Sequence, residues 1–277
     1  MTWIKYIIYI VAFIALFAFI NFFLNTHPPK FRSPETPSDY GLEYEVLRFQ
    51  TKDNLSLGGW LIKGKKDAPT IIVGHGYPFD KGNILHAVIF LNPDYTLFLY
   101  DFRSFGESDG TATTAGAKEI EDFDAAIKYL KKRKDINHTF GAYGFSLSAA
   151  TFLMAENPEI KAIVADSAYA SIQDIIGATY WYLGPLKLPF IWMTEFYGKL
   201  FYGIDAGKYK ARITVPTLLI HGDADSQIPV SNSQKIYETN KKMAELWIIK
   251  GADHGMSYVT EPKAYREKIR KFFDKNL

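Results

Sequence analysis

Residues 144–148, which read Gly-Phe-Ser-Leu-Ser, constrain the fold of this chain more than any other stretch. An apolar, strand-like run precedes them (139–143) and a helix-like run follows (147–155). The chain must turn so tightly at Ser146 that the residues two before and two after it have to be small. Such a turn lifts the serine hydroxyl out of the sheet and aims the first helix amides at a bound anion. It predicts a serine nucleophile, although a serine that merely caps a helix gives a similar pattern.

A serine hydroxyl is a poor nucleophile at neutral pH, so it needs a histidine to take its proton and an acid to orient that histidine. Only two histidines follow Ser146 in the sequence. His254 lies just past the strand-like run 245–250, where a loop can carry it over the sheet. His221 ends the strand-like run 217–221, and an acidic loop follows it at 222–229. Serine, then acid, then histidine at strand ends is the order that a catalytic triad takes in one class of sheet proteins.

With these residues the chain resembles the α/β-hydrolases, and among them the membrane-anchored BEM46-like serine hydrolases. The similarity runs from about Tyr44 to the C-terminus. It rests on Gly-His-Gly at 74–76, Asp-Phe-Arg-Ser-Phe-Gly-Glu-Ser at 101–108, the turn at 144–148, and His-Gly-Asp-Ala-Asp-Ser-Gln-Ile-Pro at 221–229. The resemblance implies that Asp225 is the acid and His254 the base. The chain departs from the family pattern at Ser104 and Ser148, where glycine is usual.

The glycines of the turn at 74–77 let the backbone pass close to the nucleophile. The backbone amides of Tyr77 and Leu147 are then the predicted oxyanion donors, because Pro78 has no N–H to offer. An ordinary strand-ending turn is the alternative interpretation of this block. Asp101 and Arg103 are expected to be structural loop residues.

Composition narrows the function further. The chain has 277 residues, 48% of them hydrophobic, and a formal net charge of +2. Near-neutral charge without a basic run gives no reason to expect nucleic acid as a partner. The absence of cysteine from the sequence excludes disulfides, zinc–thiolate sites and a cysteine nucleophile. The scattered histidines predict no metal site, and no cofactor is expected.

The N-terminus reads as a separate unit. Residues 6–24 are apolar apart from Asn21, and about 19 helical residues reach roughly 28 Å, close to the ~30 Å hydrocarbon core. A cleaved signal peptide is the competing interpretation, but no cleavage site of the A-x-A type follows. We therefore expect residues 1–26 to be a single-pass cell-membrane anchor, in an orientation that the flanking charges leave open. Residues 27–40, rich in proline, predict a semi-rigid linker that lifts the domain off the membrane.

The domain expected at residues 41–277 begins with an antiparallel pair at 42–50 and 56–63, after which strand-like and helix-like runs alternate. This alternation predicts a mainly parallel sheet with helices on both faces, and the resemblance implies that the sheet is that of an α/β-hydrolase domain. Between 167 and 214 no strand fits and aromatic residues abound, and the resemblance implies a small helical cap inserted in this interval. Its aromatics either form an apolar acyl pocket near the bilayer or pack among themselves.

Together these features predict a membrane-anchored serine hydrolase. It would cleave carboxylic ester or thioester bonds of a small-molecule or lipid-like acyl substrate, through an acyl-enzyme on Ser146. Two alternatives remain: a serine peptidase of the prolyl type, and a non-catalytic membrane scaffold on the same fold.

Overall fold

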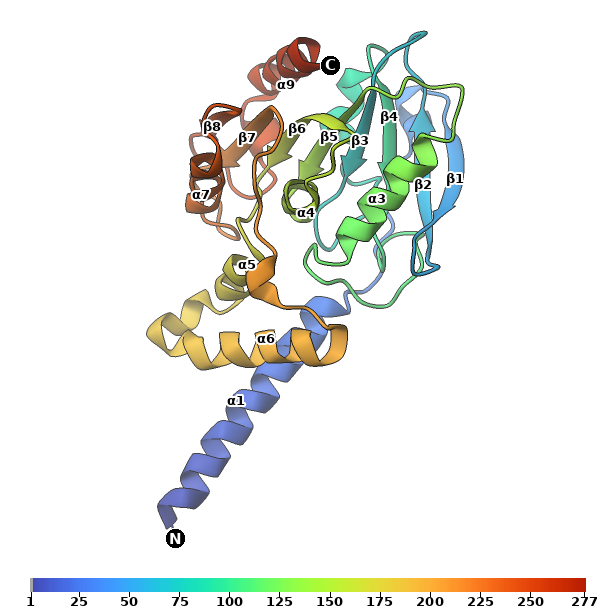
Figure 1. Cartoon of the computed structure of the whole chain (residues 1–277). Coiled ribbons are helices and arrows are strands. Elements are labelled where there is room, and N and C mark those ends of the chain that lie inside the picture. Colours follow the sequence, from blue (N-terminus) through green and yellow to red (C-terminus); the bar gives the residue numbers. More distant parts are fainter. Residues whose placement is uncertain (1) are drawn as a thin grey trace.

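A single eight-stranded sheet forms the centre of the protein. The computed structural model describes residues 2–277 (Figure 1). The strands lie in the order β1-β2-β4-β3-β5-β6-β7-β8. They are β1 Glu45–Gln50, β2 Ser56–Ile62, β3 Thr70–Gly74, β4 Thr96–Tyr100, β5 Phe140–Phe145, β6 Ile160–Asp166, β7 Thr217–Gly222 and β8 Ala244–Ile249. β1 and β2 pair antiparallel, as do β2 and β4, whereas every other neighbouring pair is parallel. The mainly parallel sheet predicted from the sequence is confirmed.

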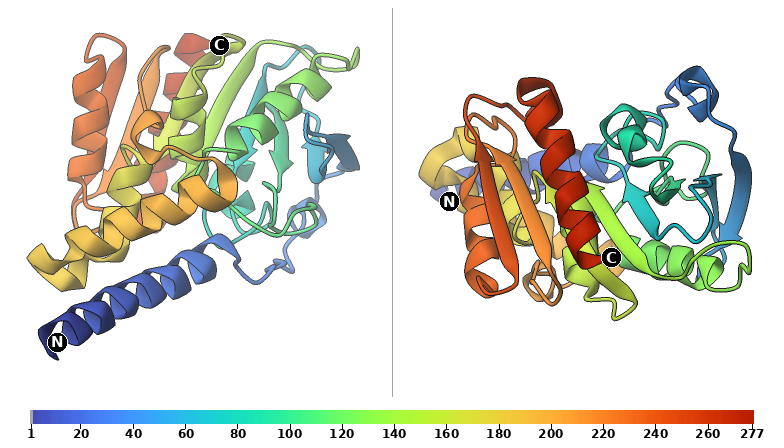
Figure 2. Two further views of the ribbon diagram at one scale, coloured as in Figure 1. Left: turned by 60° about the horizontal axis from the view of Figure 1, so that its bottom comes forward. Right: turned by 90° about the horizontal axis from the view of Figure 1, so that it is seen from above.

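Helices cover both faces of the sheet, as the views of Figure 2 show. The helices of the described chain, including those that lie elsewhere, are α1 Thr2–Thr26, α2 Leu85–Val88, α3 Glu119–Leu130, α4 Leu147–Ala155, α5 Ile172–Thr179, α6 Leu188–Tyr202, α7 Ser231–Thr239, α8 Ser257–Thr260 and α9 Pro262–Asn276. Short 3₁₀ turns occur at η1 Pro37–Tyr40, η2 Ile89–Leu91, η3 Trp181–Lys187 and η4 Ala206–Lys208. α3 starts at Glu119, after Gly116, whose φ of +100° lies outside the helical range.

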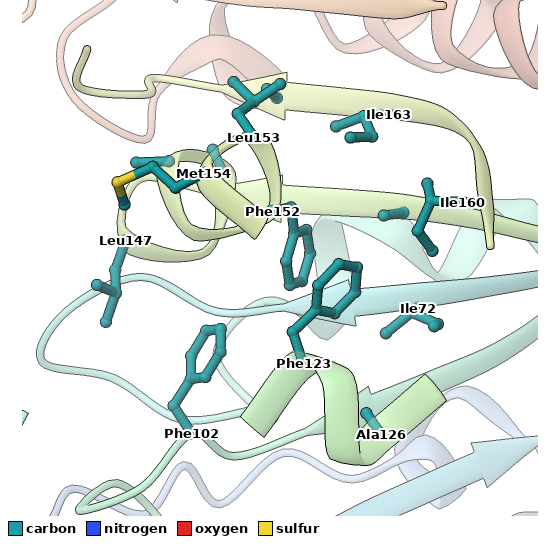
Figure 3. Packing of buried hydrophobic residues seen from close by; sticks show 14 of the residues in the cluster. Ile72, Phe102, Phe123, Ala126, Leu147, Phe152, Leu153, Met154, Ile160 and Ile163 are labelled. Atoms are coloured by element: carbon teal, nitrogen blue, oxygen red, sulfur yellow. The ribbon is translucent and has the colours of Figure 1, made fainter. Parts of the chain in front are cut away.

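Two apolar layers hold the helices onto the sheet. In the first, α3 and α4 pack on one face, and the rings of Phe123 and Phe152 stack with centroids 4.1 Å apart (Figure 3). In the second, α2 and α9 cover the other face, and the buried side chains of Leu85 and Phe273 belong to this layer. The parallel strands β3 to β7 are therefore almost entirely buried, as their apolar runs require, whereas the edge strand β8 is partly exposed.

The loop that follows β4 is fixed by buried ion pairs. Lys81 Nζ lies 2.7 Å from Asp101 Oδ2, and both side chains are buried. Arg103 contacts Asp122 with its Nη2 2.7 Å from Oδ1 and its Nε 3.0 Å from the same oxygen. These contacts agree with the structural role expected for Asp101 and Arg103, since removing one partner leaves an uncompensated buried charge.

The cap lies between β6 and β7. Within residues 167–214 the described chain forms α5, η3, α6 and η4, with one isolated bridge between Ser171 and Lys210 and no strand. These helices lie on the side of the sheet from which α1 departs (Figure 1). The helical cap predicted from the sequence is therefore present.

α1 is one continuous helix, and Trp3–Thr26 is long and apolar enough to cross a membrane. The segment that follows α1 lies against the domain. Pro28 is buried, and the amide of Ser33 donates to Asp80 Oδ2 at 2.9 Å. The amide of Thr113 also donates to the carbonyl oxygen of Thr26 at 2.8 Å. The backbone of this segment is thus hydrogen-bonded along the domain surface, and its expected role as a spacer from the membrane stays a prediction.

Candidate active site

The sharp turn at Ser146 is built as its sequence predicts. Ser146 joins β5 to α4 with φ 53° and ψ −107°, a strained backbone for a residue with a side chain. A Cβ on Gly144 would come within 2.5 Å of the Ala149 nitrogen, so only glycine fits there. Ser148 occupies the second small position and is buried against Gly74. The turn leaves the Ser146 hydroxyl at the carboxyl end of the sheet.

Ser146, His254 and Asp225 lie in one chain of hydrogen bonds. Ser146 Oγ is 3.0 Å from His254 Nε2, and His254 Nδ1 is 2.7 Å from Asp225 Oδ2. Because the ionised carboxylate only accepts, Nδ1 carries the hydrogen and Nε2 is free to accept from the serine hydroxyl. The loops after β5, β7 and β8 thus bring the three predicted residues together. The arrangement is able to draw a proton from Ser146 as its oxygen attacks a carbonyl.

The carboxylate of Asp225 is held firmly in its ionised form. It is buried, and burial tends to raise its pKa. Asp225 accepts hydrogen bonds from His221, from His254 and from the Ile228 amide, which donates to Oδ1 at 2.7 Å. Together these bonds outweigh the effect of burial on the pKa. The pKa of Asp225 therefore lies well below its usual range, and the side chain is charged at any pH near neutrality.

His221, the other histidine that follows Ser146 in the chain, lies beside Asp225 and makes no hydrogen bond to Ser146. It is completely buried, with Nδ1 2.7 Å from Ser233 Oγ and Nε2 2.8 Å from the Ile228 carbonyl oxygen. Nε2 also lies 3.3 Å from Asp225 Oδ2. Since Nε2 must donate to the carbonyl, Nδ1 accepts from the Ser233 hydroxyl. Sequence reasoning missed this role, although a histidine four residues before the acid was a visible signal.

Two further aspartates tie the loops together. Asp223 Oδ1 accepts from the Gly251 amide at 2.6 Å. Asp253 Oδ1 accepts from the Ser226 amide at 2.8 Å and from the His254 amide at 2.7 Å. Among the described residues of these loops, Asp225 is the one acid bonded to the imidazole. Asp223 and Asp253 link the loop after β7 to the loop after β8.

The two residues whose amides are predicted as oxyanion donors lie near Ser146. Leu147 is the first residue of α4, so its amide has no partner within the helix. The Tyr77 amide donates to no acceptor within residues 2–277. Both residues line one cavity with Ser146. Gly76 lets the loop after β3 lie close to the turn at Ser146, because a Cβ at residue 76 would come within 2.6 Å of the Phe145 ring.

The cavity in front of Ser146 has a volume of about 490 Å³. Most of its wall is apolar and comes from the cap, notably Ile172, Ile175, Ile176, Tyr180 and Ile204. Unexpectedly, α1 supplies part of the wall through Asn21, Phe22, Asn25 and Thr26. Nothing in the sequence pattern pointed to this, since the packing of α1 on the cap joins residues far apart in the chain. Residues 2–277 contain no cluster of three or more potential metal ligands.

Known proteins share this architecture. Residues 60–193 match the family described as X-Pro dipeptidyl-peptidase (S15 family). The uncharacterized protein YfhR of Escherichia coli (strain K12) is 30% identical over 241 residues, covering 82% of this chain and 80% of that protein. The protein bem46 of Schizosaccharomyces pombe is 26% identical over 209 residues, covering 70% and 64%. The structure of esterase Pf2001 from Pyrococcus furiosus superposes with a TM-score of 0.74 at 30% identity, covering 90% of this chain and 99% of that one.

Proposed function

This chain belongs to the α/β-hydrolase superfamily, and from that premise we propose that it is a membrane-anchored serine hydrolase acting on carboxylic esters or thioesters. The observation that carries the proposal is the hydrogen-bonded chain from Ser146 Oγ through His254 to Asp225. The likeness to an esterase of known structure supports the choice of reaction.

In the proposed reaction Ser146 Oγ attacks the carbonyl carbon of the substrate while His254 Nε2 takes the hydroxyl proton. The carbonyl oxygen becomes an oxyanion that the amides of Tyr77 and Leu147 stabilise. When the intermediate collapses, the bond to the alcohol or thiol breaks, and His254 returns the proton to that leaving group. Water then attacks the acyl-enzyme by the same steps and releases the acid. Asp225 stays ionised and stabilises the imidazolium throughout.

Anchoring in the membrane is the second part of the proposal. It is supported by α1, whose segment Trp3–Thr26 passes the length and hydropathy criteria for a membrane span. A cleaved signal peptide would meet the same criteria. Sequencing the N-terminus of the mature protein from cells separates the two, because a start near Asn25 would reject the anchor. An anchored protein is expected to resist carbonate extraction and to be released by detergent.

A peptidase acting on short peptides is the second candidate function. The match of residues 60–193 to X-Pro dipeptidyl-peptidases favours it. Glu195 also favours it, because it is the single acidic side chain among the described residues that line the cavity, and a carboxylate can bind a peptide's terminal ammonium. If this candidate is right, Gly-Pro p-nitroanilide will be cleaved, and Glu195→Gln will slow that cleavage far more than ester hydrolysis.

The decisive experiment uses full-length protein in detergent. A fluorophosphonate probe is expected to label the wild type but not Ser146→Ala. p-Nitrophenyl esters of rising chain length, a thioester of matched chain length and Gly-Pro p-nitroanilide then rank the substrate classes. A folded wild-type protein that takes no label and cleaves none of these would instead support a non-catalytic scaffold.

A further inference from the structure

One face of α1 packs on the cap from the middle of the helix onwards. Phe17 meets Phe190 of α6 with ring centroids 5.5 Å apart, and Ala18, in the same apolar cluster, is fully buried. The hydroxyl of Tyr197 donates to the Ala15 carbonyl oxygen at 3.0 Å. Farther along, Phe22 packs against Tyr197, Phe201 and Tyr202 of α6. In Figure 2 α6 runs beside α1, so the two helices form one unit.

The point at which α6 packs on α1 limits the length of α1 that can lie alone in a membrane. The portion of α1 before the contact, residues 3–13, is exposed along its length. Those 11 residues rise roughly 16 Å, about half of the ~30 Å hydrocarbon core. α1 can therefore cross a bilayer only if the level at which α6 packs is also inside the hydrocarbon. The cap then shares one leaflet with α1.

The outer face of α6 has the composition that such a position requires. Leu188, Trp192, Phe196 and Leu200 follow each other at four-residue steps and form one row, here called the α6 ridge. They are 50%, 65%, 54% and 61% exposed. The preceding η3 adds exposed Trp181 and Leu186. A continuous apolar row of this kind facing water is rare in a soluble monomer and typical of a membrane-binding surface.

The inner faces of the same helices line the cavity of Ser146. Asn21 and Asn25 of α1 turn toward it, and their amides donate to carbonyls one turn back, at 3.0 Å and 2.8 Å. The polar residues of the apolar helix thus face the cavity. Trp181 and Tyr182 line the cavity yet remain 73% and 52% exposed, so they form its rim beside the α6 ridge. The cavity therefore opens next to the surface that would lie in lipid.

From these observations we propose that the α6 ridge and η3 lie in the leaflet that α1 crosses, and that the cavity takes the acyl chain of a lipid ester directly from that leaflet. This inference rests on the proposed hydrolase function of Ser146 and names its substrate class. α1 serves in it both as anchor and as one wall of the acyl site.

The position of the α6 ridge can be measured without any activity. Because the chain has no cysteine, Trp192→Cys provides a single labelling site in the full-length protein. A nitrobenzoxadiazole label there, in phosphatidylcholine vesicles, is expected to show blue-shifted emission and quenching by doxyl-labelled lipids. Val46→Cys is the matched control, since Val46 is 64% exposed at the β1 edge of the sheet. Equal, water-like behaviour of both labels would overturn the proposal.

A second experiment tests the route of the substrate. Full-length Leu188→Gln/Leu200→Gln protein is compared in vesicles with a Val46→Gln/Val259→Gln control, whose two sites are 64% and 56% exposed. The α6-ridge variant is expected to cleave a long-chain fluorogenic ester dissolved in the bilayer about tenfold more slowly than wild type, because its contact with lipid is weaker. Its rate on soluble p-nitrophenyl butyrate is expected to stay within about twofold of wild type. Equal losses on both esters, or no loss on either, would reject the route. Wild-type protein that cleaves neither ester would instead reject the hydrolase function and leave the labelling result standing.

Discussion

The side chain of Ser148 makes two hydrogen bonds to the backbone of Phe145: its Oγ accepts from the Phe145 amide at 2.8 Å and donates to the Phe145 carbonyl oxygen at 3.0 Å. Ser148 is fully buried, and its Cβ lies 2.3 Å from where a Cβ on Gly74 would stand. Its hydroxyl therefore belongs to the packing between α4 and the sheet. The serine at this place keeps the position small and adds a contact that glycine would lack.

The two serines are thus expected to behave differently. Ser146→Ala should abolish fluorophosphonate labelling of the protein. Ser148→Ala should keep most of the labelling but lower the free energy of unfolding by about 1 kcal/mol, because its contacts to Phe145 are lost. Labelling followed by peptide mass spectrometry, together with thermal denaturation, measures both effects. Labelling that persists without Ser146 and disappears without Ser148 would overturn the assignment of the nucleophile.

Asp225 should matter far more for turnover than Asp223. Asp225→Asn removes the carboxylate that fixes the His254 tautomer, which costs on the order of 10⁴ in kcat in comparable triads. Asp223→Asn keeps a side-chain oxygen that can still accept from the Gly251 amide, so it removes no contact to His254. Steady-state kinetics on a soluble ester ranks the two variants, and the opposite ranking would reject Asp225 as the orienting acid.

The ionisation of Asp225 should also appear in the pH dependence of stability. Its pKa in the folded protein lies below the ordinary value, so the charged form is favoured by folding. That contribution is fully present above the unfolded pKa of about 3.9 and is lost as pH falls toward the lower folded value. The difference in unfolding free energy between wild type and Asp225→Asn should therefore shrink as pH falls below about 4. Urea titrations at several pH values below about 5 test this, and a difference that grows below about pH 4 would contradict it.

His221 is expected to act as a positioning residue. His221→Ala leaves the buried Asp225 carboxylate without one donor and should cost about 1–3 kcal/mol of stability. It should also lower kcat with little change in KM, because the Asp225–His254 pair loses its fixed geometry. Ser233→Ala is the control, since it removes only the partner of Nδ1 and keeps the contact to Asp225. A purely structural role for His221 would leave kcat of the folded fraction unchanged.

Removing residues 1–39 should spare the nucleophile and alter the substrate range. The two main core layers contain no residue of α1, so the domain is expected to fold and Ser146 to take the probe. The cavity loses Phe22 and its neighbours, and the preference for long acyl chains should fall. Comparing kcat/KM along a chain-length series tests this against the full-length protein. An unchanged series would show that α1 does not contribute to the acyl site.

The parts of the site that were predictable depend on short stretches of sequence. The turn at Ser146 requires small residues at fixed offsets, and the loops that carry Asp225 and His254 follow apolar runs readable as strands. Such local patterns are sufficient to place each of the three residues at the carboxyl edge of the sheet. Their catalytic roles remain predictions for the experiments above.

The parts that were missed depend on partners distant in the chain. The contact of Ser33 with Asp80 holds the expected spacer along the domain surface. The packing of Phe22 on Tyr202 makes the expected anchor helix part of the cavity wall. Neither pairing leaves a local pattern. His221 was missed for another reason: its spacing from Asp225 was visible, but only the buried geometry tells a supporting histidine from a proton acceptor.

The packing of α6 on α1 also bears on how the protein is made. α1 leaves the ribosome long before α6, and N-terminal parts generally fold first. In an inserted chain the surface that receives Phe190 and Tyr197 is already fixed in the bilayer when the cap emerges, so the cap folds on a template. Without α1 the rings of Phe190 and Tyr197 would lie uncovered on the cap. Under the proposed anchoring, folding of the cap would therefore follow insertion of α1 into the membrane.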